Sequence, residues 1–276
     1  MSINVNNNAA ALNALQNLAN TQTRLTQSEG IVSSGLAVGS AKDNPALWSI
    51  AQGQTLEING LDAVTQSLGR ATSVADMAAA AGQNVLNLLN RLKQDALSAT
   101  EPSLDAPSRQ AYNSDFKSLL TQITNTINGA DFDGTNLLNG GATGNLNVLA
   151  SADGKTFLTL TGTDLSLGGA VVTVGATASL GTLTAATSAL SAINSSLDNV
   201  IKTMANLGVQ ANQLSSHGAF VGLLSDSLQI GVGGLVNANM GVESAKLQAL
   251  QIQQQLGTQS LSIANQSSSI ILSLFR

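Results

Sequence analysis

A single apolar repeat along residues 186–235 constrains the fold of this chain more than any other feature. Apolar residues alternate at steps of four and three from Ala186 to Leu214 without a break, and weaker residues carry the same phase to Leu235. This spacing places one stripe along a helix that packs against another helix. No proline occurs after residue 107, so nothing interrupts such a helix. We therefore expect one helix of about seven heptads.

Four further segments carry helical patterns. Residues 45–100 repeat the 3–4 spacing after Asn44-Pro45, a combination typical of a helix start. Residues 9–36 show a shorter stripe through Ala11, Leu15, Leu18, Leu25 and Val32, in which Gln22 and Glu29 occupy two further positions of the same spacing. Glycines and serines at 33–40 interrupt this helical pattern. Residues 108–128 and 240–276 complete the set of predicted helices.

The centre of the chain, residues 129–182, has a different character. Residues 145–150 and 156–161 alternate polar and apolar side chains, and the Asp153-Gly154 pair between them is typical of a hairpin turn. Residues 170–174 are a third strand candidate. The predicted fold class is therefore mainly α with a small β-rich insert, in which long antiparallel helices form a coiled-coil-like bundle.

The surface of this protein must be built from uncharged polar residues. Only 10% of the residues are charged and 3% are aromatic, with a net charge of −5, whereas soluble domains average about 25% charged residues. Such surfaces repel one another weakly, which suits a protein that packs against its own copies. The acidic balance disfavours nucleic acid. Because no run of about 18 apolar residues is present, we expect no membrane span, and the first residues lack the features of a cleaved secretion signal.

The sequence offers no catalytic or metal-binding constellation. It has no cysteine and a single histidine, His217, which we interpret as a structural residue. Residues 131–134 resemble the start of a calcium loop, but the twelfth position holds Ala142 instead of Glu. The glycines at 231–234 follow no strand, so we interpret them as a helix bend and not a phosphate site. The prediction is a protein without enzymatic activity, cofactor or metal.

Both ends of the sequence carry apolar stripes that neither end can bury alone. We expect these ends to pair with each other and with other copies in an open head-to-tail contact that generates a filament or tube. Membrane-surface helices are disfavoured because the stripes lack a face rich in Lys and Arg. The candidate assembly residues are Leu12, Leu15, Leu18, Leu25, Val32, Leu247, Leu250, Leu256, Leu261, Ile263 and Leu274.

Several short motifs, in one order along the chain, resemble the bacterial flagellins. They are NLANTQ at 17–22, SSGL at 33–36 followed by SAKDN at 40–44, ADFDGTNLL at 130–138, NLGVQAN at 206–212, ESAKLQAL at 243–250, QQLGTQ at 254–259, and ANQ at 264–266 with LSLFR at 272–276. Because the resemblance covers about the first 140 and last 95 residues, the chain is identified as a member of that family, of a short, alphaproteobacterial type.

The resemblance implies a subunit of the flagellar filament that is exported unfolded and lies outside the cell. It implies partners: copies of the chain or other flagellins, an export chaperone, and the filament cap and hook-associated proteins. It also implies a domain order. Residues 1–44 and 232–276 would form the inner tube, 45–129 and 183–231 the helical spoke, and 130–182 a variable outer insert.

Two finer expectations come with the resemblance. Flagellins are often modified on exposed hydroxyls, which makes Thr161, Thr163, Thr173, Thr177 and Ser179 candidates for O-glycosylation. Hook–filament junction proteins share the same plan of terminal helices and remain the alternative function. An effector or enzyme that borrows the export signal is a third hypothesis, which the lack of a catalytic constellation disfavours.

Overall fold

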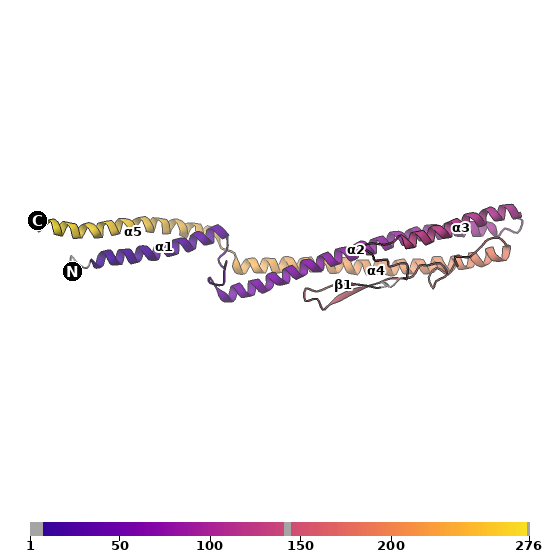
Figure 1. Cartoon of the computed structure of the whole chain (residues 1–276), viewed down its shortest axis with the longest axis horizontal. Coiled ribbons are helices and arrows are strands. Elements are labelled where there is room, and N and C mark those ends of the chain that lie inside the picture. The colour runs from indigo at the N-terminus through magenta and orange to yellow at the C-terminus, as the bar shows by residue number, and fades with distance from the viewer. Residues whose placement is uncertain (1–7, 141–144, 275–276) are drawn as a thin grey trace. The chain divides into compact units, whose positions relative to one another are not determined.

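The computed structural model describes residues 8–140 and 145–274, with side chains as far as Gln266. The elements in order are α1 (Ala9–Ser34), α2 (Pro45–Ala99), α3 (Ala106–Asn128), β1 (Asn145–Leu149), β2 (Phe157–Thr161), α4 (Leu183–Val236) and α5 (Met240–Leu274) (Figure 1). The chain forms two compact units: residues 1–56 with 227–276, and residues 57–226. The mainly α class with a small β insert is confirmed.

The helix boundaries follow local capping signals. The Asn8 side chain accepts a hydrogen bond from the Ala11 amide, and the Asp105 carboxylate accepts one from the Ser108 amide. At the start of α2, Asn44 accepts from the Leu47 amide at 3.1 Å. These side chains satisfy amides that have no partner within the helix. Gly35 ends α1 with φ +74°, a conformation that other residues rarely adopt.

The core of the 57–226 unit lies between α2, α3 and α4. The predicted repeat on α4 is confirmed, because Ile193, Val200, Leu207, Leu214 and Val221, spaced seven apart, are all buried. From α2 the buried set includes Val64, Leu89 and Leu92, and from α3 it includes Phe116, Leu119 and Ile123. The helices α2 and α4 come close where Gly82 faces Met204, since a Cβ at Gly82 would overlap the methionine sulfur.

The predicted hairpin is also confirmed. Strands β1 and β2 pair antiparallel with Leu146 opposite Leu160 and Val148 opposite Leu158. Both edges of this two-stranded sheet are tied to helices: the Leu149 amide donates to Ser67 Oγ on α2, and the Thr161 amide donates to Gln210 Oε1 on α4. An otherwise unpaired edge is thereby covered.

The third strand candidate, residues 170–174, was wrong. The amides of Thr173 and Val174 donate to the hydroxyl of Ser196 on α4, at 3.0 and 3.3 Å, and not to a neighbouring strand. Ser196 is fully buried. A buried serine in the helix therefore satisfies backbone groups that would otherwise need a strand partner.

The glycines at 231–234, where the sequence predicts a bend, lie inside α4, which continues through them to Val236. Each glycine lowers helix propensity by about 1 kcal/mol, which does not end a helix whose Val232 and Leu235 are half-buried. The chain turns at residues 237–239 instead. There the Ala37 amide donates to the Val236 carbonyl at 2.7 Å, and the Ala238 amide donates to the Gly35 carbonyl at 2.9 Å.

Candidate assembly surface

Helices α1 and α5 lie side by side in opposite directions (Figure 1). We call their shared contact the seam. On both helices the residues with restricted exposure follow an unbroken 3–4 alternation, which is the a and d pattern of a coiled coil. The seam comprises Ala11, Ala14, Leu18, Thr21, Leu25, Ser28 and Val32 on α1, and Glu243, Leu247, Leu250, Gln254, Gly257, Leu261 and Ala264 on α5.

The structure corrects the stripe expected on α1. The sequence pattern favoured Leu15, Gln22 and Glu29 at alternate seam positions, but all three are exposed, and their preceding neighbours Ala14, Thr21 and Ser28 face α5. Gln22 still contacts α5, because its Oε1 accepts a hydrogen bond from Gln254 Nε2. Small residues at these positions permit close approach of the two backbones. A Cβ on Gly257 would lie 3.1 Å from the Leu18 side chain, which shows how little space remains. The register was misread because a leucine is a stronger apolar signal than an alanine.

Polar contacts fix the register of the seam. The buried Ser28 hydroxyl donates to Glu243 Oε1 at 2.6 Å, and Lys246 Nζ lies 3.0 Å from the same oxygen. The Ser28 hydrogen bond, together with Lys246, holds the pKa of the Glu243 carboxyl below its usual range. Near the other end, Asn8 Nδ2 donates to the Ala264 carbonyl at 2.8 Å. Sliding the helices by one turn would break both contacts.

The predicted assembly residues divide into two groups. Leu18, Leu25, Val32, Leu247, Leu250 and Leu261 lie in the seam within one chain. Leu12, Leu15, Leu256 and Ile263 remain more than half exposed, at 58, 53, 63 and 59%. Leu274 lies in α5 beyond the side chains that the structure describes. One chain therefore uses only part of its terminal apolar surface.

Helix α5 carries a second apolar stripe besides the seam. We call it the outer stripe: Val242, Ala245, Ala249, Ile252, Leu256, Gln259 and Ile263. These residues occupy the c and f positions, which face away from the partner helix of a coiled coil and are normally polar. Every apolar side chain between 241 and 266 lies in the seam or in the outer stripe, and the other exposed positions hold polar residues or glycine. The helix is therefore apolar on two opposite faces.

The candidate glycosylation residues differ in exposure. Thr161, Thr173 and Thr177 are exposed, whereas Thr163 and Ser179 are half-buried. Two of the hydroxyls have protein partners, because Thr173 Oγ1 donates to the Ala192 carbonyl and Ser179 Oγ donates to Asn113 Oδ1. Of the five, Thr161 and Thr177 combine exposure with a hydroxyl for which no hydrogen bond is seen in the part of the chain that the structure describes.

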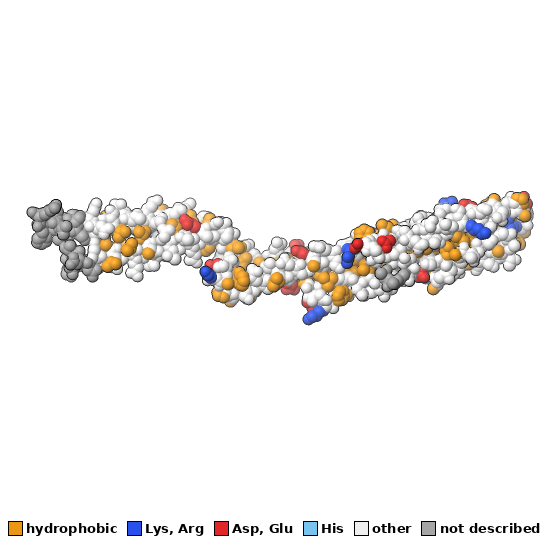
Figure 2. All heavy atoms as spheres, viewed as in Figure 1, with side chains coloured by type: hydrophobic (Ala, Val, Ile, Leu, Met, Phe, Trp, Pro, Cys, Tyr) orange, Lys and Arg blue, Asp and Glu red, His pale blue; other side chains and the backbone are white. Residues whose placement is uncertain are grey.

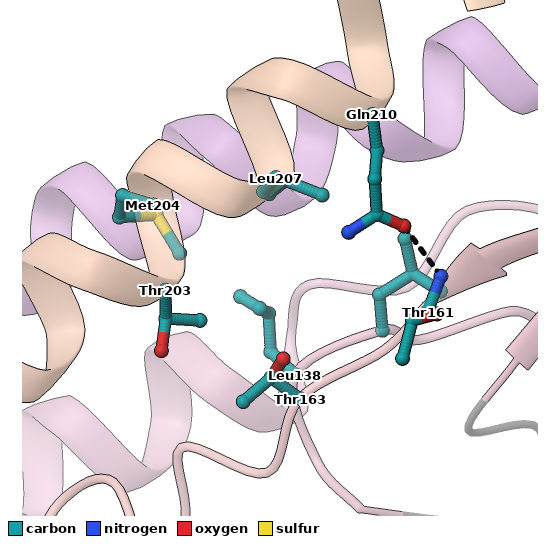
Figure 3. Close-up of a pocket in the computed structure, with 8 residues that line it drawn as sticks. Leu138, Thr161, Thr163, Thr203, Met204, Leu207 and Gln210 are labelled. Carbon is teal, nitrogen blue, oxygen red and sulfur yellow. Dashed lines mark hydrogen bonds between the residues drawn. The ribbon is translucent and has the colours of Figure 1, made fainter. Parts of the chain in front are cut away.

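One cavity between α4 and the insert is too small for a ligand. Leu138, Thr161, Thr163, Met204, Leu207 and Gln210 line a cavity of about 10 Å³ (Figure 3). This is about the volume that one water molecule needs. The Gln210 side chain closes one side by accepting the Thr161 amide at 2.6 Å.

His217 and Asp131, the polar residues considered above as possible ligands, have hydrogen-bond partners within the fold. His217 Nε2 lies 2.8 Å from the Ala150 carbonyl, which ties α4 to the hairpin. Asp131 Oδ1 accepts the Gly134 amide and caps a tight turn. Within residues 8–140 and 145–274 no group of three or more His, Asp or Glu side chains is placed to hold a metal ion.

One helix departs from the expectation about membrane spans. By length and composition, α4 passes the requirement for a membrane-crossing helix, with an 18-residue window of mean hydropathy 1.5 of which 6% is buried. The expectation of no membrane span rested on the lack of an unbroken apolar run, a stricter requirement than a mean over 18 residues. Elsewhere along α4, the buried residues pack in the core described above.

Comparisons with known proteins give the family of this chain. Residues 5–143 match the profile of the bacterial flagellin N-terminal helical region, and residues 190–275 match that of the C-terminal helical region. Flagellin FljM of Caulobacter vibrioides is 46% identical over 272 residues, which cover 99% of this chain and 98% of that protein. A flagellin of Brucella melitensis is 36% identical over 278 residues, covering 98% of each chain. The solved structure of Bacillus cereus flagellin matches with a TM-score of 0.49 and 20% identity, over 56% of this chain and 86% of that one.

Paired terminal helices with a further apolar face are typical of helical proteins that pack against other chains. The chain belongs to the bacterial flagellins, and it is a structural subunit of the flagellar filament that drives swimming. The alternative of a hook–filament junction protein is not supported. The filament that flagellins form lies outside the cell, and self-polymerisation, alone or with other flagellins, comes with the family.

Proposed function

We propose that the outward faces of α1 and α5 are the surface through which copies of this chain assemble, and that its role is mechanical and not catalytic. The outer stripe of α5 carries the proposal. Leu256 and Ile263 lie on it, and Leu12 and Leu15 give α1 an exposed apolar face of its own. The seam holds the two helices in register, so that both faces are presented together.

The energetics favour assembly through this surface. Burying one exposed Leu or Ile stabilises by about 1.5–3 kcal/mol, and four such residues would contribute several kcal/mol per contact before the cost of association. Few charges oppose the approach of a copy, since Glu243 and Lys246 neutralise each other at 3.0 Å. The space-filling view likewise shows few charged side chains among uncharged atoms (Figure 2).

Partners, secretion and domain order follow as part of the same proposal. The exposed stripe would aggregate in a free monomer, which supports an export chaperone that covers it before secretion through the flagellar export channel. The filament cap and hook-associated proteins would meet the same helices at the ends of the polymer. Residues 1–44 and 232–276 would form the inner tube, 45–129 and 183–231 the spoke, and 130–182 the outer insert, where Thr161 and Thr177 are the best-placed acceptors for a sugar.

A pair of variants one residue apart tests the proposal. Leu256→Glu places a charge in the outer stripe, and Gln255→Glu places the same charge beside it, at an exposed polar position. We expect both to remain folded by circular dichroism, and only Gln255→Glu to form filaments in negative-stain electron microscopy after addition of a precipitating salt. Normal filaments from Leu256→Glu would show that the outer stripe is not the assembly surface.

A further inference from the structure

Three Asn-Gly pairs occur in the sequence, at residues 59–60, 128–129 and 139–140. An Asn side chain followed by glycine can lose ammonia, because the glycine amide nitrogen attacks the side-chain carbonyl carbon and no Cβ hinders the ring that forms. The reaction needs an amide that can give up its proton and a backbone that can rotate to close the ring. The fold therefore decides which of the three pairs can react.

Two of the pairs are held by helical hydrogen bonds. Asn59 and Gly60 lie inside α2, where each amide donates to the carbonyl four residues earlier. At the end of α3, the Gly129 amide donates to the Asn125 carbonyl at 2.9 Å. These bonds hold the amide proton and fix the backbone on both sides of it. Neither pair can close a ring without local unfolding of its helix.

The third pair is placed differently. Asn139 and Gly140 lie between α3 and β1, outside the helices and strands that the structure describes, and Gly140 is exposed while Asn139 is half-buried. Gly140 has φ +63°, a conformation that glycine adopts freely. Across residues 8–140 and 145–274, no acceptor is placed for the Gly140 amide. Its proton and its backbone are therefore not held as they are at the other two pairs.

We propose that Asn139 is a site of spontaneous deamidation in the folded protein. The Gly140 nitrogen bonds to Cγ of Asn139 and the Cγ–Nδ2 bond breaks, so that the side-chain NH₂ leaves as ammonia with the Gly140 amide proton. Water then opens the five-membered imide at one of its two carbonyls and yields aspartate or isoaspartate. The new acid ionises, which adds one negative charge to a chain whose net charge is −5. The site lies in the 57–226 unit and is independent of the proposed assembly surface.

The Asp164 carboxylate lies against the reacting pair. Its Oδ1 accepts the Ser166 amide at 2.8 Å, and its Cγ and Oδ2 would each lie 2.7 Å from a Cβ added to Gly140. The charge of Asp164 opposes loss of the Gly140 amide proton, because that step builds negative charge beside it. After the reaction, the same charge repels the new carboxylate at residue 139. Asp164 therefore slows the modification and gives it a structural consequence.

The repulsion acts on a short backbone pairing. Thr163 and Leu165, on either side of Asp164, donate their amides to the carbonyls of Leu137 and Leu138 at 2.7 and 2.8 Å. This pairing joins the segment before the modified residue to the segment that follows β2. Deamidation should therefore loosen the insert at this point.

The three pairs provide a comparison within one molecule. Each follows a branched aliphatic residue, which keeps their intrinsic rates similar: Ile58, Ile127 and Leu138. The full chain is kept in neutral buffer, with and without guanidinium chloride, and is then digested at mildly acidic pH. Peptide mass spectrometry follows the mass gain from amide to acid at each pair. We expect Asn139 to react at least tenfold faster than Asn59 and Asn128 in the folded chain, and the three rates to agree within threefold in denaturant. A rate at Asn139 no higher than the other two in the folded chain overturns the inference.

A charge variant tests the place of Asp164. Asp164→Asn should speed deamidation of Asn139 at least twofold and leave Asn59 and Asn128 unchanged. Asp198→Asn, at an exposed position of α4, makes the same change in net charge and should leave all three rates unchanged. Equal rates at Asn139 in the two variants would show that Asp164 does not act on this pair.

The structural consequence has its own measurement. Asn139→Asp reproduces one product of the reaction, whereas Asn139→Gln keeps the amide and forms the ring poorly. Hydrogen exchange of the Thr163 and Leu165 amides should be at least threefold faster in Asn139→Asp than in Asn139→Gln. Equal exchange would show that the pairing does not respond to the new charge, and would overturn the proposed consequence.

Discussion

Asp95 on α2 is a carboxyl placed where its charge is unfavourable. Its Oδ2 is buried and has no hydrogen-bond donor within the described part of the chain. Burial raises the pKa of Asp95 from 3.8 to about 6, and the neighbouring carboxylate of Asp115 on α3 adds to the rise, while Arg91 opposes it. A hydrogen bond between the two carboxyls forms only when one of them is protonated, so the contact between α2 and α3 depends on pH.

Replacing Asp95 by Asn should stabilise the protein at pH 8 and not at pH 4. The folded state holds the proton more tightly than the unfolded chain, so stability falls as the pH rises from about 4 to about 6 and stays low above that. We expect a gain of about 1 kcal/mol in the free energy of unfolding at pH 8, after allowance for solvent screening. Urea unfolding at both pH values measures it, with Asp62→Asn at an exposed position of α2 as control. An equal gain at pH 4 would contradict the assignment.

Gly60 and Gly69 on α2 separate a packing requirement from helix propensity. At Gly60 an added Cβ would lie 2.8 Å from the Ala152 Cβ and 3.2 Å from its carbonyl oxygen, whereas at Gly69 nothing lies within 4 Å. Alanine improves helix propensity at both by about 1 kcal/mol. We therefore expect Gly69→Ala to stabilise by about that amount, and Gly60→Ala to destabilise because the hairpin must move.

Thermal unfolding and limited proteolysis of the hairpin test this pair together. Gly60→Ala should show faster cleavage between β1 and β2, and Gly69→Ala should not. If the two variants gain stability equally, the hairpin is not seated on α2 as the structure describes.

At the scale of elements, one hydrogen bond in the seam between α1 and α5 involves a fully buried hydroxyl, that of Ser28. Ser28→Ala removes the hydroxyl that donates to Glu243 at 2.6 Å, and the loss of a hydrogen bond to a charged group from a buried site should cost about 1–2 kcal/mol locally. This bond lowers the pKa of Glu243 in the folded state. Its contribution to stability is therefore present at pH values above the ordinary pKa of 4.5, and it is lost as the pH falls through the lowered pKa of the folded state.

Hydrogen exchange of the α1 amides measures that loss. Ser28→Ala should exchange faster than the unmodified chain at pH 7, and the difference should shrink toward pH 3 after correction for intrinsic rates. Ser262→Ala, at an exposed position of α5, serves as the control and should change nothing. A difference that persists unchanged into acid would mean that Glu243 does not carry the effect.

The elements also show what sequence patterns can and cannot predict. The long helices α2 and α4 were predicted from their repeats, because a heptad pattern over many turns has one interpretation. The α1 register was not, since Ala14 and Leu15 are adjacent and only the neighbouring helix decides between them. The loop at 170–174 was misread because its partner, Ser196, lies 22 residues or more away inside a helix. The apolar residues of the outer stripe are visible in the sequence of α5. They are recognised as a separate stripe only once the seam residues are known to face α1.

For the whole molecule, the terminal segments should be required for polymerisation and dispensable for the 57–226 unit, whose core residues lie outside them. Deleting residues 257–276 removes Leu261 and Ala264 from the seam and Ile263 from the outer stripe. We expect a monomer by analytical ultracentrifugation that keeps most of its helical circular dichroism and forms no filaments. A variant in which residues 257–276 are scrambled, at the same composition, keeps length and hydrophobicity but ends both stripes before residue 257. If the scrambled variant polymerises, general hydrophobicity drives assembly; if it stays monomeric beside a polymerising unmodified chain, the two-faced pattern of α5 is the determinant.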